Sequence, residues 1–240
     1  MTVVTPAILA DLAPDGVLRA AINFGNPVLA QQGADGSPQG VSVQLAKTLA
    51  QELGVELKMV TFDAAGKVFA ALEHGTWDIA FLAIEQVREE QIAFSEPYVA
   101  IEGTYLVAAD SAFTSVADLD AEGLRLAVGK GAAYDLYLSR TLRHAELVRA
   151  ETSAGAVDLY MELGLDAAAG VRQPLEKIAD TNARYRVLED AFTSIRQAMA
   201  VPKKRLEGAA YVNAFVQRQK ANGLVRKALN ATGQAEVAIP

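Results

Sequence analysis

Residues 41–83 read VSVQLAKTLAQELGVELKMVTFDAAGKVFAALEHGTWDIAFLA. Apolar residues recur at helical spacing over 41–53, and a glycine follows them where a helix commonly ends. The same stretch predicts a strand over 55–62, a second helix over 64–73 and a short buried strand over 78–83. Helices that alternate with strands in this way favour parallel strands with helices on the faces of the sheet.

The alternation continues on both sides of this stretch. Before it, we expect a short helix with Thr5 as N-cap and a strand over 17–24. A helix is expected over 85–92, followed by a turn over 94–98. Further strands and helices are predicted at 124–128, 132–143, 146–149, 154–163, 166–169, 174–180, 185–188, 206–221 and 223–231. The chain therefore predicts two successive α/β series.

Two long extended segments, 99–108 and 193–201, lie between these series. They are the expected crossings between two lobes, because the chain would leave the first lobe, build the second and return. Lobe 1 is expected to comprise residues 1–100 and 198–240, and lobe 2 residues 101–197. We thus expect a two-lobed α/β fold with a mostly parallel sheet in each lobe, two hinge strands and a ligand cleft between the lobes.

Composition excludes several classes of protein. Among 240 residues, 29 acidic side chains outnumber 22 Lys and Arg, which gives a formal net charge of −7. This charge argues against a nucleic-acid partner, which needs a concentrated basic face. The absence of cysteine excludes disulfides, Fe–S clusters and a thiol nucleophile. With only two histidines, far apart in the chain, we expect neither a metal site nor a cofactor.

The location is predicted from the first residues. Residues 1–6 show no basic stretch followed by an apolar one, so no secretory signal is visible and a cytoplasmic location is expected for the chain as given. A periplasmic or extracellular location is the alternative if a signal has been removed. No apolar run approaches the ~18–20 residues of a membrane span, and we expect a monomer without membrane insertion.

Arg88 is the sharpest candidate for binding chemistry. It follows the buried strand 78–83, and the carboxyl end of a parallel strand is where open α/β sheets bind ligands. A guanidinium at that edge can hold a carboxylate through two hydrogen bonds. The alternative is an exposed Arg paired with Glu89 or Glu90.

Four further groups of residues offer polar groups that could bind a ligand or stabilise the fold. The turn 129–134 (GKGAAY) could offer backbone N–H groups to an anion, or serve only packing. Arg172 or Gln173 could face the cleft or be solvated. Glu102 interrupts an apolar run and needs a partner, either a ligand ammonium group or a structural Arg or Lys. Asn23, Asn26 and Asp63 follow strands of lobe 1, and Asp63 could instead cap the next helix.

These features together resemble the bacterial solute-binding proteins of family 3, the amino-acid-type receptors of ABC importers. The resemblance spans about residues 16–232, and its most specific part is Arg88 followed by Phe94-Ser-Glu-Pro-Tyr98. It implies the type II periplasmic-binding-protein fold, hinge closure, a small carboxylate ligand and an ABC transporter permease as partner. It further implies that Arg88 binds the ligand carboxylate, with help from the turn Gly131-Ala132-Ala133.

The chain departs from the family at three positions of the implied site. Ala83 and Ala132 stand where the family usually has hydroxyl side chains, and Val171 stands where amino-acid binders have an aspartate for the ammonium group. Glu102 or Asp135 could supply the missing charge, or the ligand could lack an α-amine. The predicted ligand-binding residues are Arg88, Ala83, Gly131, Ala132, Ala133, Glu102, Asn26 and Val171.

Non-catalytic binding is the expected function. One alternative is a dehydratase of cyclohexadienyl acids on the same fold, which needs a general acid; Glu85 and Glu102 are the candidates. A second alternative is a cytoplasmic sensor or carrier without a transporter.

Overall fold

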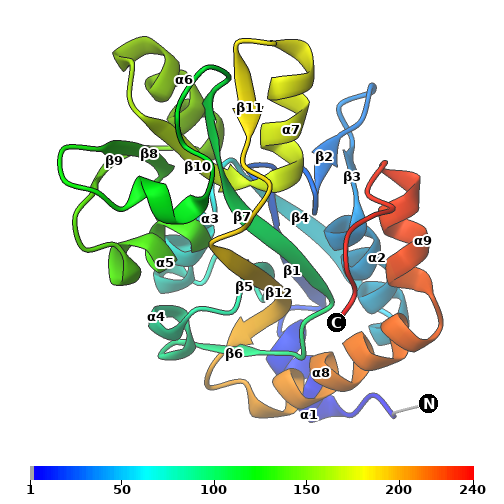
Figure 1. Cartoon of the computed structure of the whole chain (residues 1–240). Helices are drawn as coiled ribbons and strands as arrows, with labels where there is room; N and C mark the ends of the chain where they lie inside the picture. The colour runs from blue at the N-terminus through cyan, green and yellow to red at the C-terminus, as the bar shows by residue number, and fades with distance from the viewer. Residues whose placement is uncertain (1–2) are drawn as a thin grey trace. The chain divides into compact units, whose positions relative to one another are not determined.

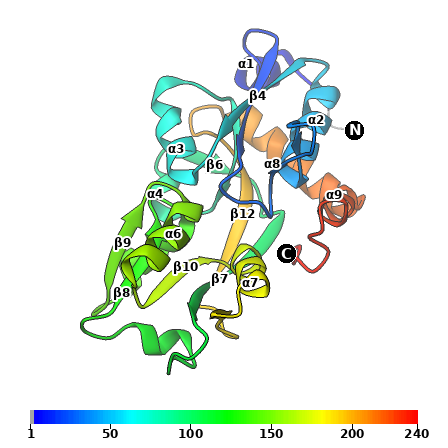
Figure 2. The ribbon, with the colours of Figure 1, turned by 90° about the horizontal axis from the view of Figure 1, so that it is seen from above.

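The computed structural model describes residues 3–240 (Figures 1 and 2). Met1 and Thr2, which the predicted lobe 1 includes, lie outside the described residues. Contacts within the chain define two compact units. Unit 1 comprises Met1–Asp63, Lys67–Ala100 and Arg196–Pro240, and unit 2 comprises Ala64–Gly66 and Ile101–Ile195.

Four strands of the unit 1 sheet run in one direction, and the fifth, β12, runs in the opposite direction. Its order is β4, β1, β5 and β12, with β6 also paired to β12. β1 runs parallel to β4 and β5, whereas β12 runs antiparallel to β5 and to β6. The strands are β1 (Val17–Asn23), β4 (Glu56–Phe62), β5 (Ile79–Ala83), β6 (Ile92–Phe94) and β12 (Thr193–Pro202).

The helices of unit 1 bury their apolar faces on this sheet and on one another. α2 packs on β1 and β4, and α9 packs on α2 and α8. Val41, Leu45, Leu49 and Leu53 lie on the buried side of α2, as their helical spacing predicts. The elements are α1 (Pro6–Leu12), α2 (Val41–Leu53), α3 (Ala65–Ala70), η1 (Ala71–His74), α4 (Gln86–Glu89), α8 (Leu206–Ala221), α9 (Leu224–Ala231) and the small hairpin β2 (Gln31–Gln32) and β3 (Pro38–Gln39). The first two residues of α3, Ala65 and Gly66, are assigned to unit 2.

Unit 2 repeats the same plan. Its sheet has the order β7, β10, β8 and β9, with β11 also paired to β7. β8 runs parallel to β9 and β10, and β7 runs antiparallel to β10 and β11. The elements are β7 (Val99–Ala108), η2 (Val116–Leu119), β8 (Arg125–Gly129), α5 (Ala133–Thr141), β9 (Glu146–Ala150), α6 (Ser153–Leu163), β10 (Ala167–Val171), α7 (Arg172–Thr181) and β11 (Tyr185–Val187).

An apolar cluster forms a core between the helices and the sheet of unit 2. α6 packs on β8, β9 and β10, and α7 packs on β10 and β11. Since β8 and β10 are parallel neighbours, their carboxyl ends, at Gly129 and Val171, lie at one edge of the sheet. The segments that follow them, which include the predicted binding turn, begin at that edge. The cluster comprises Leu106, Ala127, Ala156, Val157, Tyr160, Leu165, Ala168 and Leu175.

The predicted α/β alternation is confirmed. The structure differs from the prediction in the extent of one helix and in the direction of two strands. The expected helix over 85–92 is wrong at its end, because only Gln86–Glu89 is helical and Ile92–Phe94 forms β6. β6 pairs with residues 200–202, a partner that local periodicity cannot reveal. The sheets are also mixed, because β12 and β7, the two long predicted crossing strands, run antiparallel to their neighbours β5 and β10.

Candidate functional site

Arg88 lies just beyond the carboxyl end of β5, in the short helix α4. β5 is buried along its whole length, which fixes the start of the following turn. The Arg88 side chain is only 1% exposed, and its Nη1 donates to the carbonyl oxygen of Ala83 at 3.0 Å. Burial lowers the pKa of the Arg88 guanidinium to about 10, and the neighbouring Glu85 carboxylate opposes this shift. The alternative of an exposed, solvated arginine does not fit this position.

Gln197 lies directly opposite Ala83 on the neighbouring strand β12. Paired residues of antiparallel strands project their side chains on the same face of the sheet. Gln197 is 5% exposed, and its backbone carbonyl accepts from the N–H of Tyr98 at 2.9 Å. Sequence reasoning missed this residue. The available signal was a carboxamide that directly precedes the apolar run 198–201 in an expected extended segment.

In the turn that precedes α5, two of the three N–H groups of residues 131–133 donate hydrogen bonds within the chain. Gly131 has a φ of 70°, and its N–H donates to Oδ2 of Asp135 at 2.8 Å. The N–H of Ala132 donates to the carbonyl oxygen of Gly129 at 3.1 Å. Ala132 is the N-cap of α5 and offers no side-chain capping bond, and Ala133 is the first helical residue. Of these three N–H groups, only that of Ala133 has no acceptor recorded among residues 3–240.

Close packing explains the glycine at position 131. A Cβ there would lie 2.9 Å from the Cα of Gly66, and one at Gly66 would lie 2.9 Å from the carbonyl oxygen of Lys130. The two glycines thus allow two backbone segments of unit 2 to touch. The glycine of this turn therefore serves packing, which is one of the two roles that the sequence left open.

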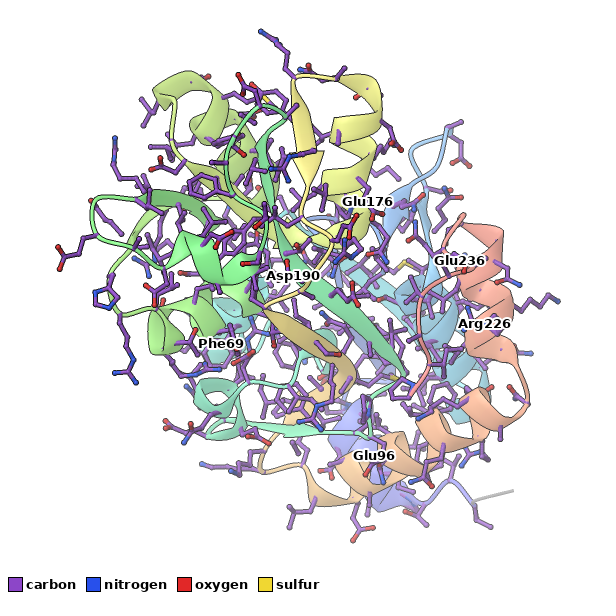
Figure 3. The ribbon with its side chains drawn as sticks, in the orientation of Figure 1. Phe69, Glu96, Glu176, Asp190, Arg226 and Glu236 are labelled. Carbon is purple, nitrogen blue, oxygen red and sulfur yellow. The ribbon has the colours of Figure 1, made fainter. Side chains whose placement is uncertain are left out.

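Glu102 is paired with Arg172 inside unit 2. The Arg172 Nε contacts Oε2 of Glu102, and its Nη1 donates to the carbonyl oxygen of Leu188 at 3.0 Å. Arg172 also donates to the carbonyl oxygen of Asp190 at 3.1 Å and lies 3.6 Å from Glu176; Figure 3 labels these two acids. Glu102 therefore has the structural partner that the sequence left open as an alternative.

The other nominated acid, Asp135, is also neutralised locally. It is buried, and Oδ1 accepts from Nε of Arg149 at 3.0 Å while Oδ2 accepts from Gly131. Val171, at the end of β10, is buried and apolar. The two acids nominated to replace the missing aspartate therefore both carry an arginine partner already.

The polar side chains at the ends of β1 and β4 bond residues close to them in the sequence. The Asn23 side chain accepts from the N–H of Gly25 at 2.9 Å, and that of Asn26 accepts from Val28 at 3.2 Å. Asp63 pairs with Lys67 at 2.9 Å, so its carboxylate is engaged by a side chain one turn along. These contacts explain Asn23, Asn26 and Asp63 as loop-forming residues without invoking a ligand.

The structure groups the predicted site residues by unit. Arg88, Ala83 and Asn26 belong to unit 1, and Arg88 contacts Ala83 directly. Glu102 and Val171 belong to unit 2, as do Gly131, Ala132 and Ala133. In unit 2, Val171 pairs with Gly103, which places Glu102 next to the end of β10.

Comparison with known proteins identifies the family. The sequence pattern of the bacterial extracellular solute-binding proteins, family 3, matches residues 18–231. The chain belongs to this family. A curated relative, the L-cystine-binding protein TcyJ of Escherichia coli, is 25% identical over 219 residues, which cover 88% of this chain and 80% of that protein.

Solved structures of family 3 proteins and their relatives share the fold. The cysteine-binding protein of Campylobacter jejuni superposes with a TM-score of 0.82 at 22% identity, covering 95% of this chain and 93% of that one. The ancestral amino-acid-binding protein AncCDT-1, described as a precursor of cyclohexadienyl dehydratase, gives a TM-score of 0.78 at 26% identity, covering 93% and 98%. The expected type II periplasmic-binding-protein fold is confirmed.

The family also bears on location. Its members are described as extracellular, so the expected cytoplasmic location has no support from the comparison. None of the helices in residues 3–240 combines the length and the apolar character that crossing a membrane requires.

Proposed function

We propose that this family 3 protein binds a small carboxylate-bearing solute, an amino acid or a related organic acid, as the substrate-binding component of an ABC-type transport system. The buried guanidinium of Arg88 at the carboxyl end of β5 is the observation that carries the proposal. A guanidinium matches a carboxylate in shape and charge, and the pair can form two parallel hydrogen bonds.

Burial makes this arginine suitable for an anionic ligand. Desolvation disfavours the charged guanidinium, yet a pKa of about 10 keeps Arg88 protonated at neutral pH. A bound carboxylate would stabilise that charge in surroundings where water screens it little. Because Nη1 is fixed by the Ala83 carbonyl, the side chain is held in one orientation before the ligand arrives.

We propose fewer ligand contacts from unit 2 than the family resemblance implies. Two of the three expected backbone donors in 131–133 already have acceptors, so the N–H of Ala133 is the proposed contact to the ligand. Val171 would line the site as an apolar residue. Glu102 and Asp135 are proposed to be structural, since Arg172 and Arg149 neutralise them.

Thermal unfolding with a panel of ligands tests the arginine. The panel contains amino acids, 2-oxo acids, dicarboxylates and aromatic acids. A ligand at ~100 times its dissociation constant should raise the free energy of unfolding by about 2.7 kcal/mol, a shift of roughly 5–10 °C. Arg88→Met should lose this shift, because it removes the charge and keeps a long apolar side chain.

Arg186→Met is the matched control. Arg186 donates to the carbonyl oxygens of Ala109 and Ser111 in unit 2, so its loss should lower the melting temperature and leave the ligand shift intact. Retention of the full ligand shift in Arg88→Met would contradict the proposed function.

We propose binding without catalysis. A dehydratase needs a general acid in a desolvated site, and of the two candidates Glu102 is exposed and held by Arg172. Glu85 precedes α4 and is partly exposed. Prephenate and arogenate should therefore keep their absorbance spectra during incubation with the protein, and turnover of either acid would establish the dehydratase alternative.

The family suggests where the protein acts. We propose a location outside the cytoplasmic membrane and a permease of an ABC transporter as partner, by analogy with the extracellular family members. Fractionation of the source cells tests this location, and recovery of the protein in the cytoplasmic fraction would favour the sensor or carrier alternative.

A further inference from the structure

Gln197 stands apart from the other buried polar side chains of residues 3–240. Each of the others forms a side-chain hydrogen bond within the described chain, whereas no such bond is recorded for the Gln197 carboxamide. The residue as a whole is 5% exposed, but Nε2 and Oε1 of Gln197 do not belong to the fully buried, unpartnered polar atoms of the described chain, so the tip of the side chain reaches the surface. A carboxamide that forms no internal bond and reaches the surface can bond a molecule from outside the chain. The compared side chains are Asn23, Ser42, Asp78, Arg88, Ser95, Thr104, Asp135 and Gln219.

The position of this carboxamide connects it with Arg88. Gln197 and Ala83 are directly paired across β12 and β5, and Arg88 donates to the carbonyl oxygen of Ala83. Cβ atoms of such a pair lie about 5 Å apart on one face, and the Ala83 methyl group leaves room above it for a longer neighbour. Gln197 and Arg88 are therefore both neighbours of Ala83, at the carboxyl end of β5.

We propose that Gln197 is a specificity-determining residue that binds the substituent next to the ligand carboxylate. This inference rests on the proposed role of Arg88. A carboxamide carries both a donor and an acceptor, so it can bond an amino, hydroxyl or oxo group at that carbon. A plain alkanoic acid would cover the carboxamide without bonding it and should bind more weakly.

The first test needs no ligand. Gln197→Met replaces the carboxamide by an apolar group of similar length and should leave the melting temperature unchanged or raise it, because no internal bond is lost. Gln219→Met is the matched control, since the Gln219 carboxamide donates to Glu52 at 2.9 Å and accepts from Asn222 at 2.8 Å. That variant should melt lower. An equal fall in both variants would overturn the inference, because it would reveal internal bonds of Gln197.

The second test uses pairs of acids that differ only beside the carboxylate. The pairs are L-cysteine with 3-mercaptopropionate, L-arginine with 5-guanidinopentanoate, and L-lactate or pyruvate with propionate. Titration calorimetry on the wild type should show the substituted acid of at least one pair bound about tenfold or more tightly than its partner. Gln197→Met should reduce that ratio to near one while retaining binding of the plain acid.

Arg88→Met separates this inference from the proposed function. Two results together support both the proposed function and the role of Gln197. They are loss of all binding in Arg88→Met and a reduced affinity ratio between paired acids in Gln197→Met. Unchanged binding in Arg88→Met would refute the carboxylate clamp alone. An unchanged ratio in Gln197→Met would refute the role of Gln197 alone, and failure of the wild type to bind any member of the pairs would refute the ligand class proposed for it.

Discussion

Asp78 shows how a single carboxylate can organise unit 1. It is fully buried, and it accepts from Nε of Arg19 at 2.8 Å and from Nη1 of Arg205 at 2.6 Å. Burial alone would raise its pKa, but the hydrogen bonds from the two arginines outweigh this and hold the pKa of Asp78 below its usual value. Its partners come from β1 and from the residue before α8, so one side chain joins distant parts of the chain.

We expect Asp78→Asn to lower the free energy of unfolding by about 3–5 kcal/mol at pH 7, because two arginines would lose their anion. The folded-state pKa lies below the unfolded value of about 3.9, so this stabilisation is present above that value and is lost as pH falls through the folded-state pKa. Urea unfolding between pH 7 and pH 3 should therefore show the two proteins converging at acid pH.

Asp63→Asn is the control for this prediction. Asp63 is exposed and pairs with Lys67 one turn away, so its loss should cost less than about 0.5 kcal/mol. A constant difference between Asp78→Asn and wild type across the whole pH range would show that the ionised carboxylate is not the source of the stability.

At the scale of elements, α2 illustrates how glycines set both ends of a helix. Gly40 precedes the helix with a φ of 119°, and Gly54 ends it with a φ of 69°. A Cβ at Gly40 would lie 2.5 Å from the carbonyl oxygen of Leu29, whereas a Cβ at Gly54 would meet no atom within 4 Å. The sequence predicted Gly54 as the end of the helix, and the packing shows that Gly40 is the more constrained of the two glycines.

Alanine substitution should separate these two constraints. Gly54→Ala should cost about 1 kcal/mol, the penalty of a side chain in the left-handed region. Gly40→Ala should cost at least about 2 kcal/mol, because steric overlap with Leu29 adds to the backbone strain. Chemical unfolding of the two variants measures both values, and a larger loss for Gly54→Ala would mean that the contact at Gly40 is relieved by a small backbone shift.

At the scale of the whole molecule, the exposed apolar side chains and the net charge bear on whether copies of the chain associate. The large apolar side chains that are exposed in residues 3–240 are few and separated in sequence: Val3, Val87, Leu163 and Leu206. Stable oligomers commonly bury a contiguous apolar patch. The net charge of −7 also makes copies of the chain repel one another at low salt.

We therefore expect a monomer. Size-exclusion chromatography with light scattering should give the mass of a single 240-residue chain at micromolar concentration, with and without ligand. A mass twice that value, unchanged on dilution, would contradict this prediction. It would show that the chain forms a stable dimer interface.

The sequence by itself determined most of the order of helices and strands and the position of Arg88 after a buried strand, while the type II fold was expected from the resemblance to family 3. These features depend on local periodicity and on turn residues, which act over a few neighbouring positions. The tertiary structure alone decided the partners. It paired β6 with β12, gave Arg172 to Glu102 and Arg149 to Asp135, and placed Gln197 opposite Ala83. Such contacts join residues far apart in the chain, and their energies depend on burial and distance, which no local pattern encodes.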